Sequence, residues 1–122
     1  MGTWAHGNFD NDAALDWLGE TTKKLLDEIQ VAMDAPERLQ ADEWDADIVP
    51  CKIELLCVIS EAGMRPHWPE KSTLEQWKTT YLNAWDSSID GLDPDPEYKM
   101  QRRITLVKTF NRMLHCADLN KA

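Results

Sequence analysis

Apolar residues recur every three or four positions along most of this chain, and this spacing restricts the possible fold more than any other feature. Between residues 12 and 33 the row contains Leu15, Leu18, Thr22, Leu25, Ile29 and Ala32. Such a row lies along one face of an α-helix, because the helix has about 3.6 residues per turn. The pattern therefore predicts a helix over 12–33, which Ala35-Pro36 ends.

A second row of the same kind predicts a helix over 38–62, before Gly63. Its members are Ala41, Trp44, Ile48, Cys51, Leu55, Val58 and Ala62. Pro50 lies inside this segment and opposite the row on a helical wheel, so its ring should bend the helix convex to solvent. The alternative is two shorter helices that break near 48–50.

Two further helices follow. Ser72 and Glu75 have the spacing of a capping box that opens a third helix, with Leu74, Trp77, Tyr81, Ala84, Trp85 and Ile89 on one side. Asp95 as cap and Pro96 at the first helical position start a fourth helix, which runs to about residue 117. Its expected core face is Met100, Val107, Phe110 and Leu114. No segment alternates as a strand does. We predict an all-α, four-helix bundle-like single domain over 1–122, with an N-terminal arm at 1–11.

Composition excludes several classes of protein. The chain has 122 residues, 43% of them hydrophobic, and six tryptophans, which argues for a folded core rather than disorder. Three cysteines without a C-x-x-C pair predict reduced thiols and neither a disulfide framework nor a zinc site. Because we find no signal sequence and no apolar stretch of membrane length, we expect a cytoplasmic protein without a membrane contact. We predict no cofactor.

The net charge of −9 argues against nucleic-acid binding and favours a basic protein partner. The charge is unevenly distributed. Residues 99–122, which include Lys121, contain six basic residues and one acidic residue, whereas residues 1–98 contain seven basic and twenty-one acidic residues. The excess of fourteen negative charges in the larger part exceeds what the basic C-terminal segment can neutralise.

Four carboxylates of the second predicted helix project within about 40° of one another on the helical wheel. We call Glu43, Asp47, Glu54 and Glu61 the acidic stripe. The stripe is either a docking surface for a basic partner or a solvated face, which the basic fourth helix of the same molecule could neutralise. The overall charge excess favours the docking surface.

The N-terminal segment has two interpretations. In the structural one, Asp10 or Asp12 caps the first helix and Gly7 permits a turn, while Trp4 and Phe9 cover Trp17. Trp17 needs such a cover because it lies about 200° from Leu15 on the helical wheel. In the chemical interpretation His6, Asp10 and Asp12 form the site of a metal-dependent hydrolase. The residue spacing does not fit a calcium-binding loop, so we favour the structural interpretation.

Two single residues stand out. Lys52 falls in the middle of an apolar arc, which predicts a packed stem and a salt bridge at the ammonium group. Trp68 follows His67 in a loop between prolines, and is either an anchor for a binding partner or a cover over one end of the bundle.

The opening residues carry a family resemblance. They are Met1-Gly2-Thr3-Trp4, Gly7, Phe9-Asp10-Asn11-Asp12, Ala14 and Asp16-Trp17. This string resembles the start of an uncharacterised bacterial family, known as a domain of unknown function, whose members open with MGTWG, a further glycine, FDND and a helix carrying Asp-Trp or Asp-Phe. Ala5 departs from the pattern, which has a glycine there. The resemblance implies a small helical bacterial domain and supplies no catalytic residue.

The sequence contains no glycine-rich phosphate loop, nucleophile elbow or paired metal-ligand motif. We therefore expect a small acidic cytosolic protein-binding module, most concretely an immunity or inhibitor protein that neutralises a basic toxin domain. The alternatives are the metal-dependent hydrolase and a structural homo-oligomer that buries surplus tryptophan surface.

Overall fold

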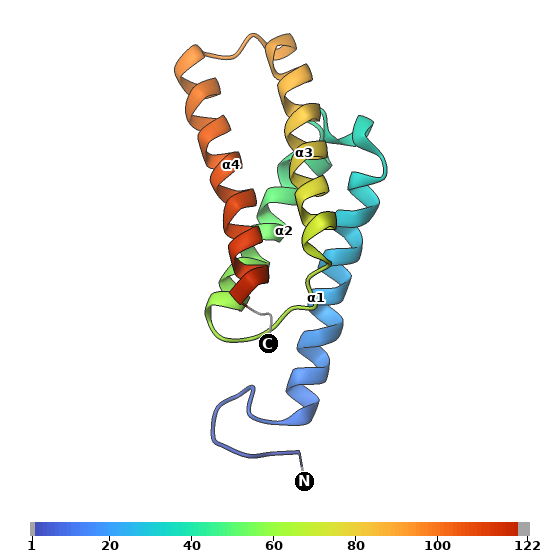
Figure 1. Ribbon diagram of the computed structural model, residues 1–122, viewed down its shortest axis with the longest axis vertical. Coiled ribbons are helices and arrows are strands. Elements are labelled where there is room, and N and C mark those ends of the chain that lie inside the picture. The colour runs from blue at the N-terminus through green and yellow to red at the C-terminus, as the bar shows by residue number, and fades with distance from the viewer. Residues whose placement is uncertain (1, 120–122) are drawn as a thin grey trace.

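The computed structural model describes residues 2–119, so Met1 and Lys121 lie outside the described residues. It contains four α-helices: α1 (Asp12–Met33), α2 (Trp44–Glu61), α3 (Lys71–Ser88) and α4 (Pro96–Leu119). Two short 3-10 helices, η1 (Pro36–Leu39) and η2 (Ile89–Leu92), follow α1 and α3. Residues 2–119 include no strand beyond an isolated bridge between Thr3 and Asn11. The helices pack side by side as a bundle, which confirms the all-α prediction (Figure 1).

Helix α1 has the predicted bounds but not the predicted cap. The side chain of Asn11 accepts a hydrogen bond from the backbone N–H of Ala14 at 2.8 Å. The prediction of Asp10 or Asp12 as the cap was wrong, because the Asp10 carboxylate accepts the N–H of Gly7 instead, and Asp12 is already the first helical residue. The charge of Asp12 still favours the positive end of the helix dipole.

Helix α2 begins at Trp44, later than predicted, because the chain first forms η1 and then passes through Asp42 with a left-handed φ of 77°. It runs without a break through Pro50, so the alternative of two helices was wrong. Pro50 is buried and does not face solvent as predicted. Its ring leaves the Ala46 carbonyl without a helical N–H partner, and the Tyr81 hydroxyl on α3 donates to this carbonyl.

The predicted core face of α2 was also wrong. The helix buries Ala46, Val49, Pro50, Ile53, Leu56, Cys57 and Ser60. In contrast, Trp44, Cys51, Leu55 and Val58 of the predicted row are exposed. Both sides of α2 carry apolar residues at helical spacing, so the periodicity identifies a helix but does not select the buried side.

Helix α3 buries the predicted residues Leu74, Trp77, Tyr81 and Trp85. Its capping box does not form, because the helix already begins at Lys71 and the preceding residue, Glu70, makes no side-chain capping bond. The Tyr81 ring packs against Phe110 of α4 with centroids 5.1 Å apart.

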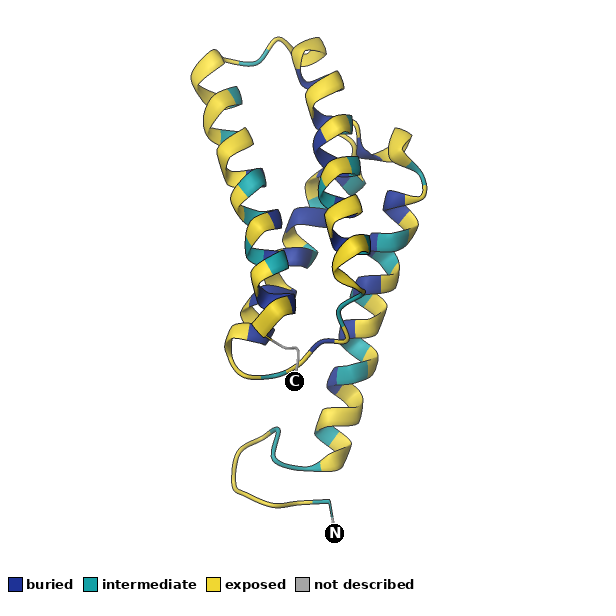
Figure 2. Ribbon diagram, in the orientation of Figure 1, coloured by how far each residue is buried: buried dark blue, intermediate teal, exposed yellow. Residues whose placement is uncertain are grey.

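Helix α4 starts as predicted, with the Asp95 carboxylate accepting the N–H of Glu97 at 2.8 Å. The prediction of Met100 as a core residue was wrong, because the first turns of α4 are exposed and the buried positions begin at Leu106 (Figure 2).

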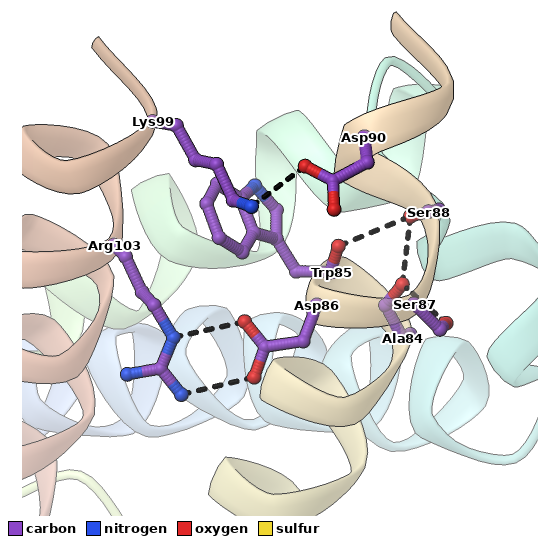
Figure 3. Close-up of polar contacts among 8 residues, drawn as sticks. All are labelled: Ala84, Trp85, Asp86, Ser87, Ser88, Asp90, Lys99 and Arg103. Atoms are coloured by element: carbon purple, nitrogen blue, oxygen red, sulfur yellow. Dashed lines mark hydrogen bonds and ion pairs between the residues drawn. The ribbon is translucent and has the colours of Figure 1, made fainter. Parts of the chain in front are cut away.

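Ion pairs join the exposed part of α4 to α3. The Arg103 guanidinium donates two hydrogen bonds to the Asp86 carboxylate, at 2.8 Å from Nε and 2.9 Å from Nη2. One turn away, Lys99 Nζ lies 2.6 Å from Asp90 Oδ1, just beyond the end of α3 (Figure 3). These contacts hold the two helices together where the apolar core is thin.

Candidate protein-binding face

The exposed side of α2 carries a line of apolar side chains, which we call the α2 row. It consists of Trp44, Cys51, Leu55 and Val58. Their positions fall within about 60° on the helical wheel. Trp44 is 74% exposed, Leu55 56% and Val58 51%. Exposed apolar residues aligned on one side of a helix make this side of α2 a candidate interaction surface.

At Trp44 the α2 row meets a hollow of about 620 Å³ between α1 and α2. Val31 of α1 and Trp44 of α2 line it and are both exposed. Lys52 also lines the hollow, with Nζ 3.6 Å from Glu28 Oε2. The predicted salt bridge of Lys52 is therefore confirmed, and because Glu28 is partly exposed it adds little to stability.

The four carboxylates of the acidic stripe differ in whether they pair with a basic side chain. Arg112 of α4 donates two hydrogen bonds to the Glu61 carboxylate, one of them 2.9 Å long, and lies 3.9 Å from Glu54. These hydrogen bonds hold the pKa of Glu61 below its ordinary value. Within residues 2–119 Glu43 and Asp47 form no ion pair. The basic fourth helix thus neutralises Glu61 and part of Glu54, and two carboxylates remain available next to the α2 row.

Trp68 does not belong to this face. Its indole N–H donates to the Ser60 hydroxyl at 3.1 Å, and its half-buried ring packs against the core cluster. The structure therefore places Trp68 over one end of the bundle, which was the alternative to a partner-binding anchor.

The N-terminal segment closes on itself instead of covering Trp17. The N–H of Trp4 donates to the Asp10 carbonyl at 3.1 Å, and the N–H of Asp12 donates to the Gly2 carbonyl at 2.6 Å. Trp17 is 59% exposed and Trp4 56%. The prediction that Trp4 and Phe9 cover Trp17 was wrong, since Trp17 stays exposed, and Trp4 and Phe9 line a hollow together with Leu15 and Leu18.

Two glycines of the family motif have a steric explanation. A Cβ on Gly2 would overlap the Asp12 carboxylate, and a Cβ on Gly7 would overlap the Asp10 carboxylate. Asp10 accepts the N–H of Gly7 at 2.7 Å, which requires this close approach. Gly7 does not have a positive φ, so its role is to leave room rather than to permit a left-handed turn.

The chemical interpretation of the N-terminal residues gains no support from the geometry. Residues 2–119 contain no group of three His, Cys, Asp or Glu side chains that could hold a metal ion. His6, Asp10 and Asp12 therefore do not converge on such a site, and the Asp10 carboxylate is engaged within its own loop.

The thiols differ in exposure. Cys57 and Cys116 are buried between α2 and α4, whereas Cys51 is exposed. Burial, with a contribution from Cys116, raises the pKa of Cys57 to about 12, and burial also raises the pKa of Cys116. The buried thiols are therefore protonated at neutral pH and unsuited to nucleophilic catalysis.

None of the helices in the described part of the chain combines the length and apolar character needed to cross a membrane.

Comparison with known proteins identifies one family. Residues 2–53 match a family model described as a domain of unknown function, DUF4259. No curated protein matches the chain, and neither does any solved structure. The matched segment contains the N-terminal loop, α1, η1 and the first half of α2, including Trp44 of the α2 row. As the opening residues suggested, residues 2–53 are thus similar to a family whose function is not known, DUF4259.

Proposed function

We propose that this chain is a small acidic protein-binding module that uses the exposed face of α2 to bind a basic protein. Its most concrete form is a bacterial immunity protein that inhibits a basic toxin domain in the cytoplasm. The observation that carries the proposal is the α2 row, in which Trp44, Leu55 and Val58 are exposed beside Glu43 and Asp47. These two carboxylates form no ion pair within residues 2–119.

The α2 row has the composition and spacing of a contact surface. With the half-buried Ile48, its positions follow steps of four and three residues, which is the spacing of the seam by which two helices pair. Complete burial of a side chain such as Leu55 contributes about 1.5–3 kcal/mol. Tryptophan is enriched among the residues that dominate binding energies, so we assign the largest single contribution to Trp44.

Electrostatics favour a basic partner. The net charge is −9, and Glu43 and Asp47 lie beside the α2 row. A negative surface of this kind accelerates association with a positive one and disfavours acidic competitors. On a basic nuclease-like toxin the same contact would cover the groove that binds its substrate.

The charges also argue against self-association through this face. The acidic stripe lies on one side of the α2 row, so an antiparallel pair of α2 helices would bring like charges together. Light scattering distinguishes the two possibilities, because the homo-oligomer predicts a mass above 14.0 kDa and the binding module predicts the monomer mass when the protein is alone.

The proposal is tested by capture from a lysate of the source cells with three tagged baits. The wild type and Met100→Glu, which alters an equally exposed residue on α4, should retain the same basic protein. The double variant Leu55→Glu with Val58→Glu should lose it. Capture of the basic protein in equal amounts by all three baits would show that the partner does not bind the α2 row.

The electrostatic acceleration of binding is tested with the captured partner by stopped-flow measurement of the association rate. Replacing Glu43, Asp47 and Glu54 with lysine should slow association by about tenfold or more at low salt, and added salt should slow the wild type. An association rate that depends neither on salt nor on these substitutions would reject the electrostatic part of the proposal.

A further inference from the structure

A second surface, built by the N-terminal loop and the first half of α1, has no role in the proposed function. Two hollows of about 680 and 740 Å³ meet there at Leu15, Gly19 and His67. Trp4, Phe9, Leu18 and Met64 also line the first hollow. Its size is that of a site for a small molecule.

Gly19 lines both hollows. It lies inside α1, where glycine lowers helix stability relative to alanine. A Cβ at this position would meet no atom within 4 Å, and Gly19 does not have a positive φ. Neither packing nor backbone conformation therefore requires a glycine, whereas a larger residue would occupy the groove.

The N-terminal loop, which lines the same hollow as Gly19, carries two aromatic residues outside the core, Trp4 and Phe9. Trp4 remains largely exposed, although backbone hydrogen bonds between residues 2–4 and 10–12 hold its loop closed. The arrangement presents Trp4 and Phe9 to the hollow on a fixed support.

The charges at the first hollow are unusual for so acidic a protein. Arg65 and His67, from the segment between α2 and α3, line it, and neither forms an ion pair within residues 2–119. The Asp10 carboxylate lines the same hollow and accepts the N–H of Gly7. The second hollow is lined by Asp16, Glu20, Lys23 and Asp27, and Lys23 pairs with Asp27. Asp16 and Glu20 make it the more acidic of the two hollows, so a negatively charged group fits the first hollow better.

We infer that this groove binds a small molecule that combines an apolar group with a carboxylate. The apolar group lies over Gly19 against Trp4 and Phe9, and the carboxylate is held by Arg65 with His67 beside it. This site is independent of the α2 row, so either proposal can fail without the other.

The test uses three eight-carbon probes, octanoate, 1-octanol and octylamine, with binding measured by titration calorimetry on the full chain. Octanoate should bind at least tenfold more tightly than the other two. The net charge of −9 favours octylamine at non-specific sites, so a preference for octanoate must come from the local groups. Equal binding of the three probes, tighter binding of octylamine, or no octanoate binding at millimolar concentration would overturn the inference.

Variants locate the site. Gly19→Leu should weaken octanoate binding at least tenfold while Tm stays equal or rises, because leucine favours the helix. Arg65→Gln should weaken octanoate at least tenfold and leave 1-octanol unchanged. Gly91→Leu, at a glycine that is equally unobstructed but lies in η2, should bind octanoate as the wild type does. Unchanged octanoate binding in Gly19→Leu or Arg65→Gln would contradict the assignment.

Discussion

Arg112 of α4 binds the Glu61 carboxylate of α2 through two hydrogen bonds, and this pair removes one end of the acidic stripe from the surface available to a partner. Glu43, at the other end of the stripe, has no such contact among the described residues. Two carboxylates of one stripe thus have different roles, one in joining helices and one at the proposed contact.

Neutralising these two carboxylates separates the roles. Glu61→Gln should lower Tm by a few degrees, because it removes the negative charge and one of the two oxygens that accept from Arg112. Glu43→Gln should leave Tm unchanged and slow partner association. Thermal unfolding followed by circular dichroism measures the first effect, and equal Tm changes in both variants would contradict this division.

The Asp86–Arg103 pair predicts a dependence of stability on pH. Hydrogen bonds from Arg103 hold the pKa of Asp86 below its ordinary value of 3.8. The pair therefore stabilises the fold above that value, and the contribution is lost as the pH falls through the lowered pKa. Asp86→Asn should unfold at lower urea concentration than the wild type at neutral pH, and the difference should shrink toward about pH 2. A constant difference across this range would show that the carboxylate charge is not responsible.

The contact between Tyr81 and the Ala46 carbonyl predicts an energetic coupling with Pro50. Tyr81→Phe should destabilise the fold by about 1–3 kcal/mol, because it leaves a buried carbonyl without a donor. In a Pro50→Ala background the residue at 50 regains an N–H that can bond the same carbonyl, so Tyr81→Phe should cost less. A double-mutant cycle from urea unfolding measures the coupling, and additive effects would contradict it.

In the N-terminal loop, we expect the helix cap Asn11 to contribute more to the stability of the fold than the exposed ring of Trp4. Asn11→Ala should cost about 1 kcal/mol, since it removes the acceptor for the N–H of Ala14. Trp4→Ala should cost less than Asn11→Ala, because the Trp4 ring is largely exposed. Urea unfolding measures the loss of unfolding free energy in both variants. A larger loss for Trp4→Ala than for Asn11→Ala would show that the Trp4 ring packs in the core.

The sequence predicts the helices better than their contacts. The bounds of α1 and the core face of α3 follow from periodicity, because most apolar residues of each helix lie on one side, although α1 also carries the exposed Trp17 and Val31. Helix α2 has two apolar sides, and the one that is buried packs against other helices through contacts between residues far apart in the chain, such as that of Tyr81 with the Ala46 carbonyl. Asn11 was missed as the cap of α1 because the adjacent residues Asp10 and Asp12 have equally suitable side chains.

The candidate face on α2 could also be predicted only in part, because its contacts involve residues from different helices. The acidic stripe is visible in the sequence, but the pairing of Glu61 with Arg112 requires two helices to be placed side by side. The exposure of Trp44, Leu55 and Val58 was missed because such residues are expected in the core. The available signal was the distribution of apolar residues around the whole of α2.

Thiol labelling at Cys51 tests the central claim most directly, because this residue lies within the α2 row and is the exposed cysteine, while Cys57 and Cys116 are buried. A maleimide reagent should modify Cys51 in the free protein and leave the buried thiols unmodified until unfolding, with Cys51→Ser as the control. In complex with the captured partner, Cys51 should react at least tenfold more slowly. Labelling of Cys51 at the same rate in the free protein and in the complex would contradict the proposal that the partner binds the exposed face of α2.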